Sequence, residues 1–370
     1  MKKLALLMTV LFCLAHMNAQ EKHYNLLVGT YTNSCKSDGI YVYDFNSGTA
    51  DFKLRNSSDK IINPSYLTVS ADLKKLYSVN EDGNKSTISA FNFDAKTGKL
   101  NFINKQNSEG ADPCHIINDA KNVIAANYSG GTISVFGKNA DGSLTAAKQV
   151  VSHEGHSVNK KRQESPHVHM VQFTPDNKYI LANDLGTDRI YVYQYQPDSE
   201  KEILKFKDSV PMKSGSGPRH MAFGPNGKFI YLLQELDGTL TVFAYADGKL
   251  KRIQETIVAA KDFMGENSAA AVKISADGKF LYATNRGEAN TISIFSIDAK
   301  GKLTLLKTIS TGGKGPRDFA IDPSGNYVLV SHQYSDNIVI FNRDQTTGLL
   351  TDSGKRIELC SPVCLVFTAE

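Results

Sequence analysis

The chain repeats one short pattern along most of its length. Each copy contains an apolar segment, a turn rich in Pro, Asp, Asn and Gly, and a second apolar segment; four clear copies are residues 170–183, 221–234, 272–285 and 319–332. A third segment with alternating polarity follows each copy, and a Gly-Lys-Leu-like stretch closes several of them. Alternation with a period of two predicts β-strands, and the turn residues permit tight reversals between them.

The spacing of the repeat predicts the architecture. Equivalent positions recur every 46 to 53 residues, at Pro64, Pro113, Pro166, Pro218, Ala269, Pro316 and Pro362. Four strands at this period are typical of one blade of a β-propeller. The sequence therefore predicts an all-β fold, a seven-bladed β-propeller with four antiparallel strands in each blade.

The two ends of the chain complete each other in this interpretation. The N-terminal part contains only the second, third and fourth strands of a blade, at residues 24–30, 39–45 and 50–54. A strand-like segment at residues 362–367 has no blade of its own. We expect this C-terminal strand to close the first blade, because closure removes the open edges of a sheet. Residues 20–370 then form a single domain.

Residues 1–19 are predicted to be a signal peptide. Lys2 and Lys3 precede an apolar run at residues 4–15, and Ala19 provides a small residue before Gln20. The apolar run is too short to span a bilayer. We expect an exported, periplasmic protein with no membrane insertion after cleavage; the alternative is a buried N-terminal helix.

Composition excludes several classes of partner and cofactor. A formal net charge of +4 over 370 residues gives no reason to expect a nucleic-acid partner. The four cysteines after residue 20 are too few for a disulfide scaffold, and Cys360 and Cys364, roughly 13 Å apart in a strand, cannot bridge directly. No Cys/His spacing resembles a zinc site, and we expect no essential metal and no cofactor.

The repeat also predicts where a functional site lies. In an antiparallel blade, the innermost strand begins on the face of the ring where the second strand ends. The first-strand starts are Ser65, Cys114, His169, Arg219, Ala270, Arg317 and Val363. The second-strand ends are Tyr31, Glu81, Tyr128, Asp184, Glu235, Arg286 and Gln333. We expect these two sets of side chains to converge on one mouth of the central channel.

Charged residues concentrate on neighbouring blades of this mouth. Arg219, Arg286 and Arg317 fall in register, and crowding three guanidinium groups is unfavourable unless acids or anions compensate them. Arginine suits bidentate recognition of phosphate or carboxylate. The pattern predicts a site for an anionic or oxygen-rich ligand, whereas a single such arginine would indicate only an exposed strand entry. His115 and His220, one residue further along, are expected to point into the packing between strands.

Two long loops are expected to overhang the mouth, at residues 152–165 and 258–267. The first loop contains His153, His156, Lys160, Lys161 and Arg162. This basic run is interpreted either as a solvated loop or as a source of positive potential for an anionic substrate.

The motifs at these positions resemble the lactonase family of seven-bladed propellers, which includes 6-phosphogluconolactonase. The resemblance covers about residues 26–367. It depends most on Pro166-His-Val-His169, Gly217-Pro-Arg-His-Met-Ala-Phe223, Glu235, Glu266-Asn-Ser-Ala-Ala270, Asn285-Arg-Gly287 and Gly315-Pro-Arg-Asp-Phe319. The related fungal carboxymuconate cyclases imply His169 (or His167), Arg219, Glu235 and Arg286 as catalytic residues, with Arg317 as an alternative to Arg286.

The resemblance implies hydrolysis of a sugar δ-lactone, with 6-phosphogluconolactone as the model substrate. Glu235 or His169 would activate water, and Arg219 would stabilise the oxyanion. The residues expected to bind the substrate are His167, Asp184, Arg317, Gln333, Glu81 and Tyr128. The alternatives are an exported, non-catalytic propeller that binds a sugar acid or a protein partner, and a lactonase or cyclase that acts on another lactone.

Overall fold

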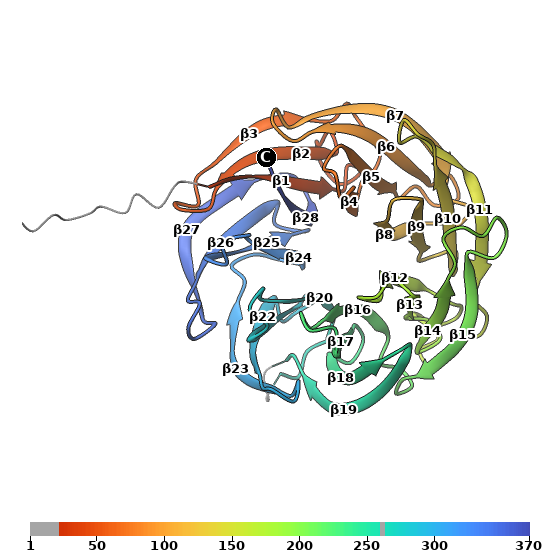
Figure 1. Cartoon of the computed structure of the whole chain (residues 1–370). Helices are drawn as coiled ribbons and strands as arrows, with labels where there is room; N and C mark the ends of the chain where they lie inside the picture. Colours follow the sequence, from red (N-terminus) through yellow and green to blue (C-terminus); the bar gives the residue numbers. More distant parts are fainter. Residues whose placement is uncertain (1–21, 260–262) are drawn as a thin grey trace, which may run out of the picture.

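The protein is a closed ring of seven antiparallel sheets around a central channel (Figure 1). The computed structural model describes residues 22–259 and 263–370, and the predicted signal peptide lies outside these residues. All 28 strands in the described residues belong to four-stranded sheets, which confirms the predicted seven-bladed, all-β fold. Across the same residues, no helix is long and apolar enough to cross a membrane.

Each blade is numbered here in ring order, with its strands given from the channel outward. Blade 1 contains β28 (Pro362–Ala369), β1 (His23–Thr30), β2 (Ile40–Asn46) and β3 (Phe52–Ser57). Blade 2 contains β4 (Leu67–Val69), β5 (Lys75–Asn80), β6 (Thr87–Asp94) and β7 (Lys99–Asn107). Blade 3 contains β8 (Pro113–Asn118), β9 (Asn122–Asn127), β10 (Thr132–Lys138) and β11 (Leu144–Ser152).

The remaining four blades have the same strand order. Blade 4 contains β12 (Val168–Phe173), β13 (Tyr179–Asp184), β14 (Arg189–Tyr195) and β15 (Leu204–Pro211). Blade 5 contains β16 (Pro218–Phe223), β17 (Phe229–Gln234), β18 (Thr239–Ala246) and β19 (Lys249–Ile257). Blade 6 contains β20 (Ala269–Ile274), β21 (Phe280–Asn285), β22 (Thr291–Ile297) and β23 (Leu303–Ser310). Blade 7 contains β24 (Pro316–Ile321), β25 (Tyr327–His332), β26 (Asn337–Arg343) and β27 (Leu350–Glu358).

The ends of the chain close the ring as predicted. Strand β28, drawn in blue, lies beside the dark red β1 (Figure 1), and their antiparallel register pairs Leu26 with Phe367 and Gly29 with Cys364. Blade 1 therefore takes its innermost strand from the C-terminus. Because β28 pairs with it, β1 has a strand partner on both sides.

A disulfide joins Cys35 to Cys360 across the closure, between residues 325 positions apart in sequence. Cys35 follows β1, and Cys360 precedes β28. The cysteine count argued against a disulfide scaffold but did not reveal this single disulfide, because one disulfide needs only two thiols that the fold brings together. Cys360 and Cys364 are not bonded to each other, as expected, and Cys114 and Cys364 are free and buried.

Packing between blades explains why the second strand of each blade is so apolar. Every residue of β13 is buried, whereas β11 on the outer edge alternates between half-buried and exposed positions after Leu144. Three buried tyrosine hydroxyls donate to carbonyl oxygens of the next blade at 2.8–3.1 Å, in the pairs Tyr77–Gly142, Tyr231–Gly301 and Tyr282–Gly348. These glycines have φ between +74° and +87°, so the recurring turn glycine serves both the backbone conformation and the contact between blades.

A β-bulge at the start of the innermost strand recurs around the ring. In β16, Pro218 pairs with Gln234 and His220 pairs with Leu233, so Arg219 is the extra residue. The same shift occurs in β8, β12 and β24, where the extra residues are Cys114, His169 and Arg317. Because a bulge redirects the side chain of the unpaired residue, each of these side chains is displaced from the regular alternation of its strand.

We expect the disulfide to stabilise the closed ring. A Cys35→Ser/Cys360→Ser double variant should lose about 2–5 kcal/mol of unfolding free energy, because a crosslink restricts the unfolded chain. Thermal and urea denaturation followed by circular dichroism would measure the loss. The reduced wild-type protein is the matched control and should melt with the double variant; equal melting temperatures for the oxidised wild type and the double variant would contradict the prediction.

Candidate active site

Three arginines surround one buried glutamate at the mouth of the channel. Arg219 Nε and Arg286 Nη2 both donate to Glu235 Oε2 at 2.9 Å, and Arg162 Nη2 donates to Oε1 at 2.6 Å. Glu235 is 3% exposed and Arg219 is 2% exposed. We call these four residues the Glu235 cluster. Its members come from blades 5 and 6 and from the β11–β12 loop, so the structure brings together the predicted Arg219, Glu235 and Arg286.

The charges of the Glu235 cluster hold the carboxylate in its ionised form. Burial alone raises the pKa of a carboxyl group, but Arg286 and Arg219 outweigh this effect and hold the pKa of Glu235 well below its usual value. Burial, together with repulsion from Arg286, lowers the pKa of Arg219. Glu235 is consequently a weak base and a strong anchor for guanidinium groups.

Arg162 is a member of this site that the repeat did not predict. It lies in the long basic loop between β11 and β12, and its Nη2 also donates to the Tyr128 hydroxyl at 3.1 Å. His153 of the same loop is buried instead, where its ring contacts Asp184 and the Tyr193 hydroxyl. The loop therefore contributes a specific ligand of Glu235, and the position of Arg162 outside the repeat concealed it.

A second carboxylate lies on the other side of the mouth. The Tyr31 hydroxyl donates to Glu81 Oε1 at 3.0 Å, and the Ser65 hydroxyl donates to the same oxygen. The Arg317 guanidinium lies 5.3 Å from the centre of the Tyr31 ring, and its Nη1 donates to Gln333 Oε1 at 3.3 Å. We call these five residues the Glu81 cluster. Burial raises the pKa of Glu81 although the charge of Arg317 opposes this shift.

His169 lies behind the two clusters on the wall of the channel. Its ring packs edge-on against Tyr128 at 5.4 Å, and burial, reinforced by the charge of Arg219, lowers the pKa of His169 well below its usual value. The imidazole is therefore neutral at pH 7. The ring of His167 stacks on Tyr128 at 4.6 Å, and its Nδ1 lies 3.0 Å from the Tyr128 carbonyl oxygen.

Asp184 lies apart from the arginines. It is fully buried, and its Oδ1 accepts hydrogen bonds from the backbone amides of His167, Gly186 and Thr187. Its Oδ2 lies 2.7 Å from His153 Nδ1. These contacts assign Asp184 to the turn after β13 and do not support the substrate-binding role expected for it.

The expected orientation of His115 and His220 is wrong. Both rings face the channel, with their centres 5.7 Å apart, and the His115 ring is tilted against the Tyr66 ring at 4.2 Å. Both histidines line a cavity of about 570 Å³ formed by the later residues of the innermost strands. The bulge explains the error, because it breaks the strict alternation that would have turned these side chains into the sheet packing.

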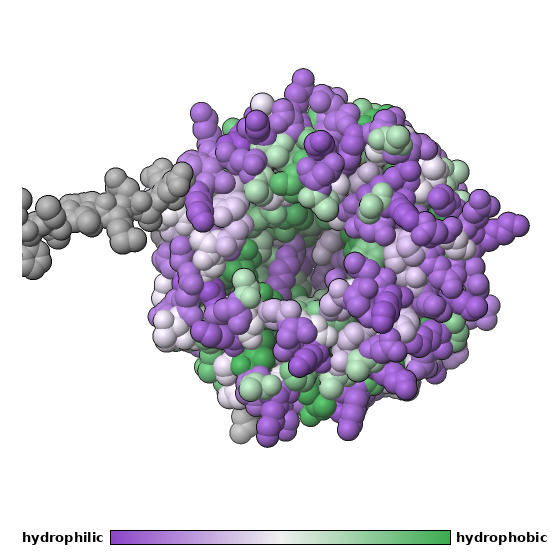
Figure 2. Space-filling view, viewed as in Figure 1, coloured by the Kyte–Doolittle hydropathy of each residue, from purple (hydrophilic) through white to green (hydrophobic). Residues whose placement is uncertain are grey.

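A small cavity lies beside the two clusters. Arg219, His220, Arg317 and Asp318 border this cavity, whose volume of about 10 Å³ is about the space that one water molecule needs. This cavity is too small to hold a sugar-sized ligand. Hydrophilic residues are visible in the hollow at the centre of the ring (Figure 2).

The donor set of the mouth suits an anion better than a metal ion. Four arginines face two glutamates, and both glutamates are occupied by hydrogen bonds or ion pairs. Within residues 22–259 and 263–370, the one group of three side chains close enough to hold a metal is His23, Asp44 and Glu370. That group lies in and beside blade 1, and Arg55 already pairs with its two acids.

Comparison with known proteins identifies the family. The model of the family described as lactonase, 7-bladed beta-propeller, matches residues 25–367. The chain belongs to this family. Membership confirms the predicted resemblance and, at the level of the family, the predicted enzyme class, a lactone hydrolase.

Several relatives match nearly the whole chain. The 6-phosphogluconolactonase of Bacillus subtilis (strain 168) is 34% identical over 345 residues, which is 92% of this chain and 97% of the relative. A candidate 6-phosphogluconolactonase of Bacteroides fragilis NCTC 9343 superposes with a TM-score of 0.91 at 42% identity, covering 95% and 99% of the two chains. A periplasmic gluconolactonase of Pseudomonas aeruginosa superposes with a TM-score of 0.89 at 37% identity, covering 94% and 99%.

Proposed function

We propose that the protein hydrolyses a sugar δ-lactone that carries an anionic group, in the manner of 6-phosphogluconolactonase. The observation that carries this proposal is the convergence of Arg162, Arg219, Arg286 and Arg317 on one mouth with only two carboxylates between them. The excess positive charge attracts an anionic substrate and stabilises negative charge that develops during the reaction. Relatives named for 6-phosphogluconolactone and gluconolactone support the same substrate class.

The arginines have hydrogen-bonding capacity left for a substrate. Arg219 uses Nε for Glu235 and Nη1 for the Ala270 carbonyl, and Arg286 uses Nε for Ser268 and Nη2 for Glu235. Arg219 Nη2 and Arg286 Nη1 have no partner among the described residues. We assign these two groups to the lactone carbonyl oxygen as it becomes an oxyanion, and Arg317 to the phosphate or acid group.

Glu81 is the better general base of the two mouth carboxylates. Water attack on the lactone carbonyl needs a group that accepts a proton near neutral pH. Glu235 is held ionised by three guanidinium groups, and the buried imidazole of His169 has a strongly lowered pKa, so both are weak proton acceptors. Glu81 combines a raised pKa with partial exposure at the mouth, and we assign it the base, with Glu235 as the anchor of Arg219 and Arg286.

Substitution of Glu81 tests this assignment. Glu81→Gln should lower kcat by roughly 100-fold to 10,000-fold, the usual contribution of a general base. Since the base acts when ionised and its pKa is raised, wild-type kcat/KM should rise with pH through a value above the ordinary 4.5 of a glutamate. A pH-stat assay on 6-phosphogluconolactone and gluconolactone, corrected for spontaneous hydrolysis, measures both.

The controls separate base from anchor. Glu235→Gln should lose activity through misplaced arginines yet keep the pH dependence, and exposed Glu154→Gln should match the wild type. If kcat/KM of the Glu81→Gln variant still rises with pH as it does in the wild type, the assignment of Glu81 as the base is refuted. Wild-type turnover no faster than spontaneous hydrolysis on both lactones would refute catalysis and favour the alternative of a non-catalytic binding protein.

Substitution of Arg219 and substitution of Arg317, the two arginines at the bulges, should impair the reaction in different ways. Arg219→Ala should lower kcat by roughly 100-fold or more, as loss of an oxyanion donor does. Arg317→Ala should mainly raise KM for the phosphorylated lactone, because it removes contact with the anionic end in both ground and transition states. Steady-state kinetics of the two variants on both lactones would show the split, and identical kinetic defects would contradict it.

We further propose that the protein is exported. The Cys35–Cys360 disulfide supports an oxidising compartment, since such bonds are rare in the cytosol. The Pseudomonas aeruginosa relative, named a periplasmic gluconolactonase, has the same architecture. Mass spectrometry of protein purified from native cells should find a mature N-terminus near Gln20, and an intact Met1 would contradict export.

A further inference from the structure

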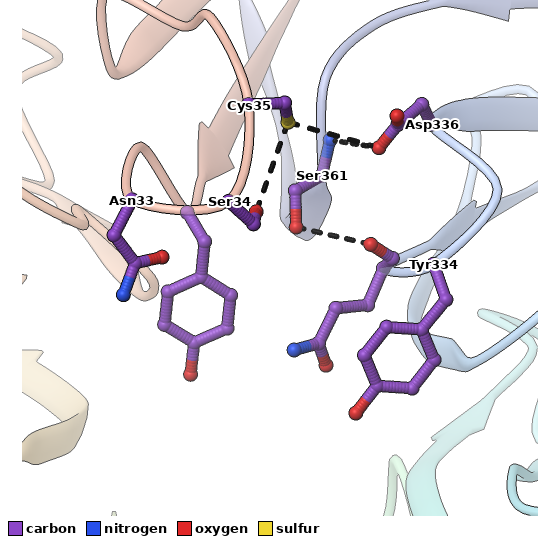
Figure 3. Close-up of a pocket in the computed structure, with 8 residues that line it drawn as sticks. Asn33, Ser34, Cys35, Tyr334, Asp336 and Ser361 are labelled. Carbon is purple, nitrogen blue, oxygen red and sulfur yellow. Dashed lines mark hydrogen bonds between the residues drawn. The ribbon is translucent and has the colours of Figure 1, made fainter.

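A pocket lies beside the Glu81 cluster at the seam where the ring closes (Figure 3). Its volume is about 360 Å³, within the range of small-molecule sites. The principal lining residues are Tyr31, Asn33, Cys35, Gln333, Tyr334 and Asp336. We call it the seam pocket. Asn33 comes from the N-terminal ribbon and Tyr334 from the C-terminal ribbon, so the pocket exists only in the closed ring.

The seam pocket is continuous with the arginine mouth. Tyr31 and Gln333 line the pocket and also contact Arg317, through the Tyr31 ring and through Gln333 Oε1. A ligand whose anionic group meets Arg317 can therefore extend directly into the seam pocket.

The chemistry of the seam pocket differs from that of the mouth. The side-chain amide of Asn33, Gln333 Nε2 and the Tyr334 hydroxyl have no hydrogen-bond partner in the described part of the chain. Amide and hydroxyl groups both donate and accept, as sugar hydroxyls do, and tyrosine rings add an apolar surface with a polar end. The charged lining residue, Asp336, is negative and accepts a hydrogen bond from the Ser361 amide at 2.9 Å. The pocket thus favours an uncharged polyol over an anion.

Tyr334 is held in place although it is 65% exposed. Gly315 has φ +71°, and a Cβ atom there would lie 2.5 Å from Tyr334 Cδ2, so the ring rests directly on the glycine. In blade 5 the equivalent residues are Gly217 and Leu236, and a Cβ atom on Gly217 would lie 2.8 Å from Leu236 Cγ. The Gly-Pro-Arg motif therefore seats one side chain over its glycine in both blades, and only in blade 7 is that side chain an exposed aromatic ring at the mouth.

We propose that the seam pocket is a subsite for an uncharged, hydroxyl-rich extension of the lactone, such as a second sugar ring linked to it. The Cys35–Cys360 disulfide fixes one wall, and the Tyr31 and Tyr334 rings supply surfaces for sugar packing. Hydrolysis of such an extended lactone rests on the proposed function. Binding of the extension does not, because the open-chain sugar acids produced by hydrolysis occupy the same space without reacting.

Isothermal titration calorimetry with two such acids tests the subsite. Cellobionate carries one glucose unit more than gluconate, so the wild-type protein should bind cellobionate about tenfold more tightly or better. Tyr334→Leu, which installs the residue of the equivalent position in blade 5, should bring the ratio of the two Kd values close to one. Tyr334→Phe keeps the ring and should keep most of the preference. Phe102→Leu, an exposed aromatic on the outer strand β7, is the matched control and should leave both Kd values unchanged.

The outcomes separate this proposal from the proposed function. Equal Kd values for the two acids in the wild type, or a preference that survives Tyr334→Leu, would overturn the subsite even if gluconolactone is hydrolysed normally. A cellobionate preference that depends on Tyr334 supports the subsite, and it does so even if neither lactone is hydrolysed, in which case only the proposed catalysis fails.

Discussion

The pairing of β1 with β28 closes the ring, and part of the mouth depends on this closure. Seven twisted sheets form a ring only if the last blade meets the first, and here a strand from each end of the chain makes that contact. The Glu81 cluster depends on it directly, because Arg317 of blade 7 packs on Tyr31 of blade 1, whose hydroxyl bonds to Glu81 at the edge of blade 2. The Glu81 cluster therefore forms only in the closed ring, whereas the Glu235 cluster comes from blades 5 and 6 and the β11–β12 loop.

The mouth holds two glutamates in opposite electrostatic environments. Three guanidinium groups surround Glu235 and lower its pKa, whereas burial raises the pKa of Glu81 against the opposing effects of Arg317 and of two hydroxyl groups. Environments that push the pKa values of neighbouring acids apart allow them to take different roles. One carboxylate can then organise cations permanently while the other exchanges protons with the solvent and the substrate.

Most of the fold and part of the site follow from the repeat. A period near 50 residues predicted the blades, the unpaired C-terminal strand and the convergence of Arg219, Glu235 and Arg286. Features outside that register could not be read in the same way. Arg162 lies in an insertion, the Cys35–Cys360 pair joins residues 325 apart, and the bulges reversed the expected orientation of His115 and His220. Asp184 lies at a second-strand end, as Glu235 does, but its carboxylate accepts a hydrogen bond from the turn that follows β13.

The recurrent bulge separates the architecture from the chemistry of the mouth. The extra residue at the start of β8, β12, β16 and β24 takes no part in the register between the two inner strands. Its side chain can therefore change without altering strand pairing. The equivalent position is cysteine, histidine or arginine in different blades. Substrate range in such a ring can diverge one blade at a time, by single substitutions that leave the scaffold untouched.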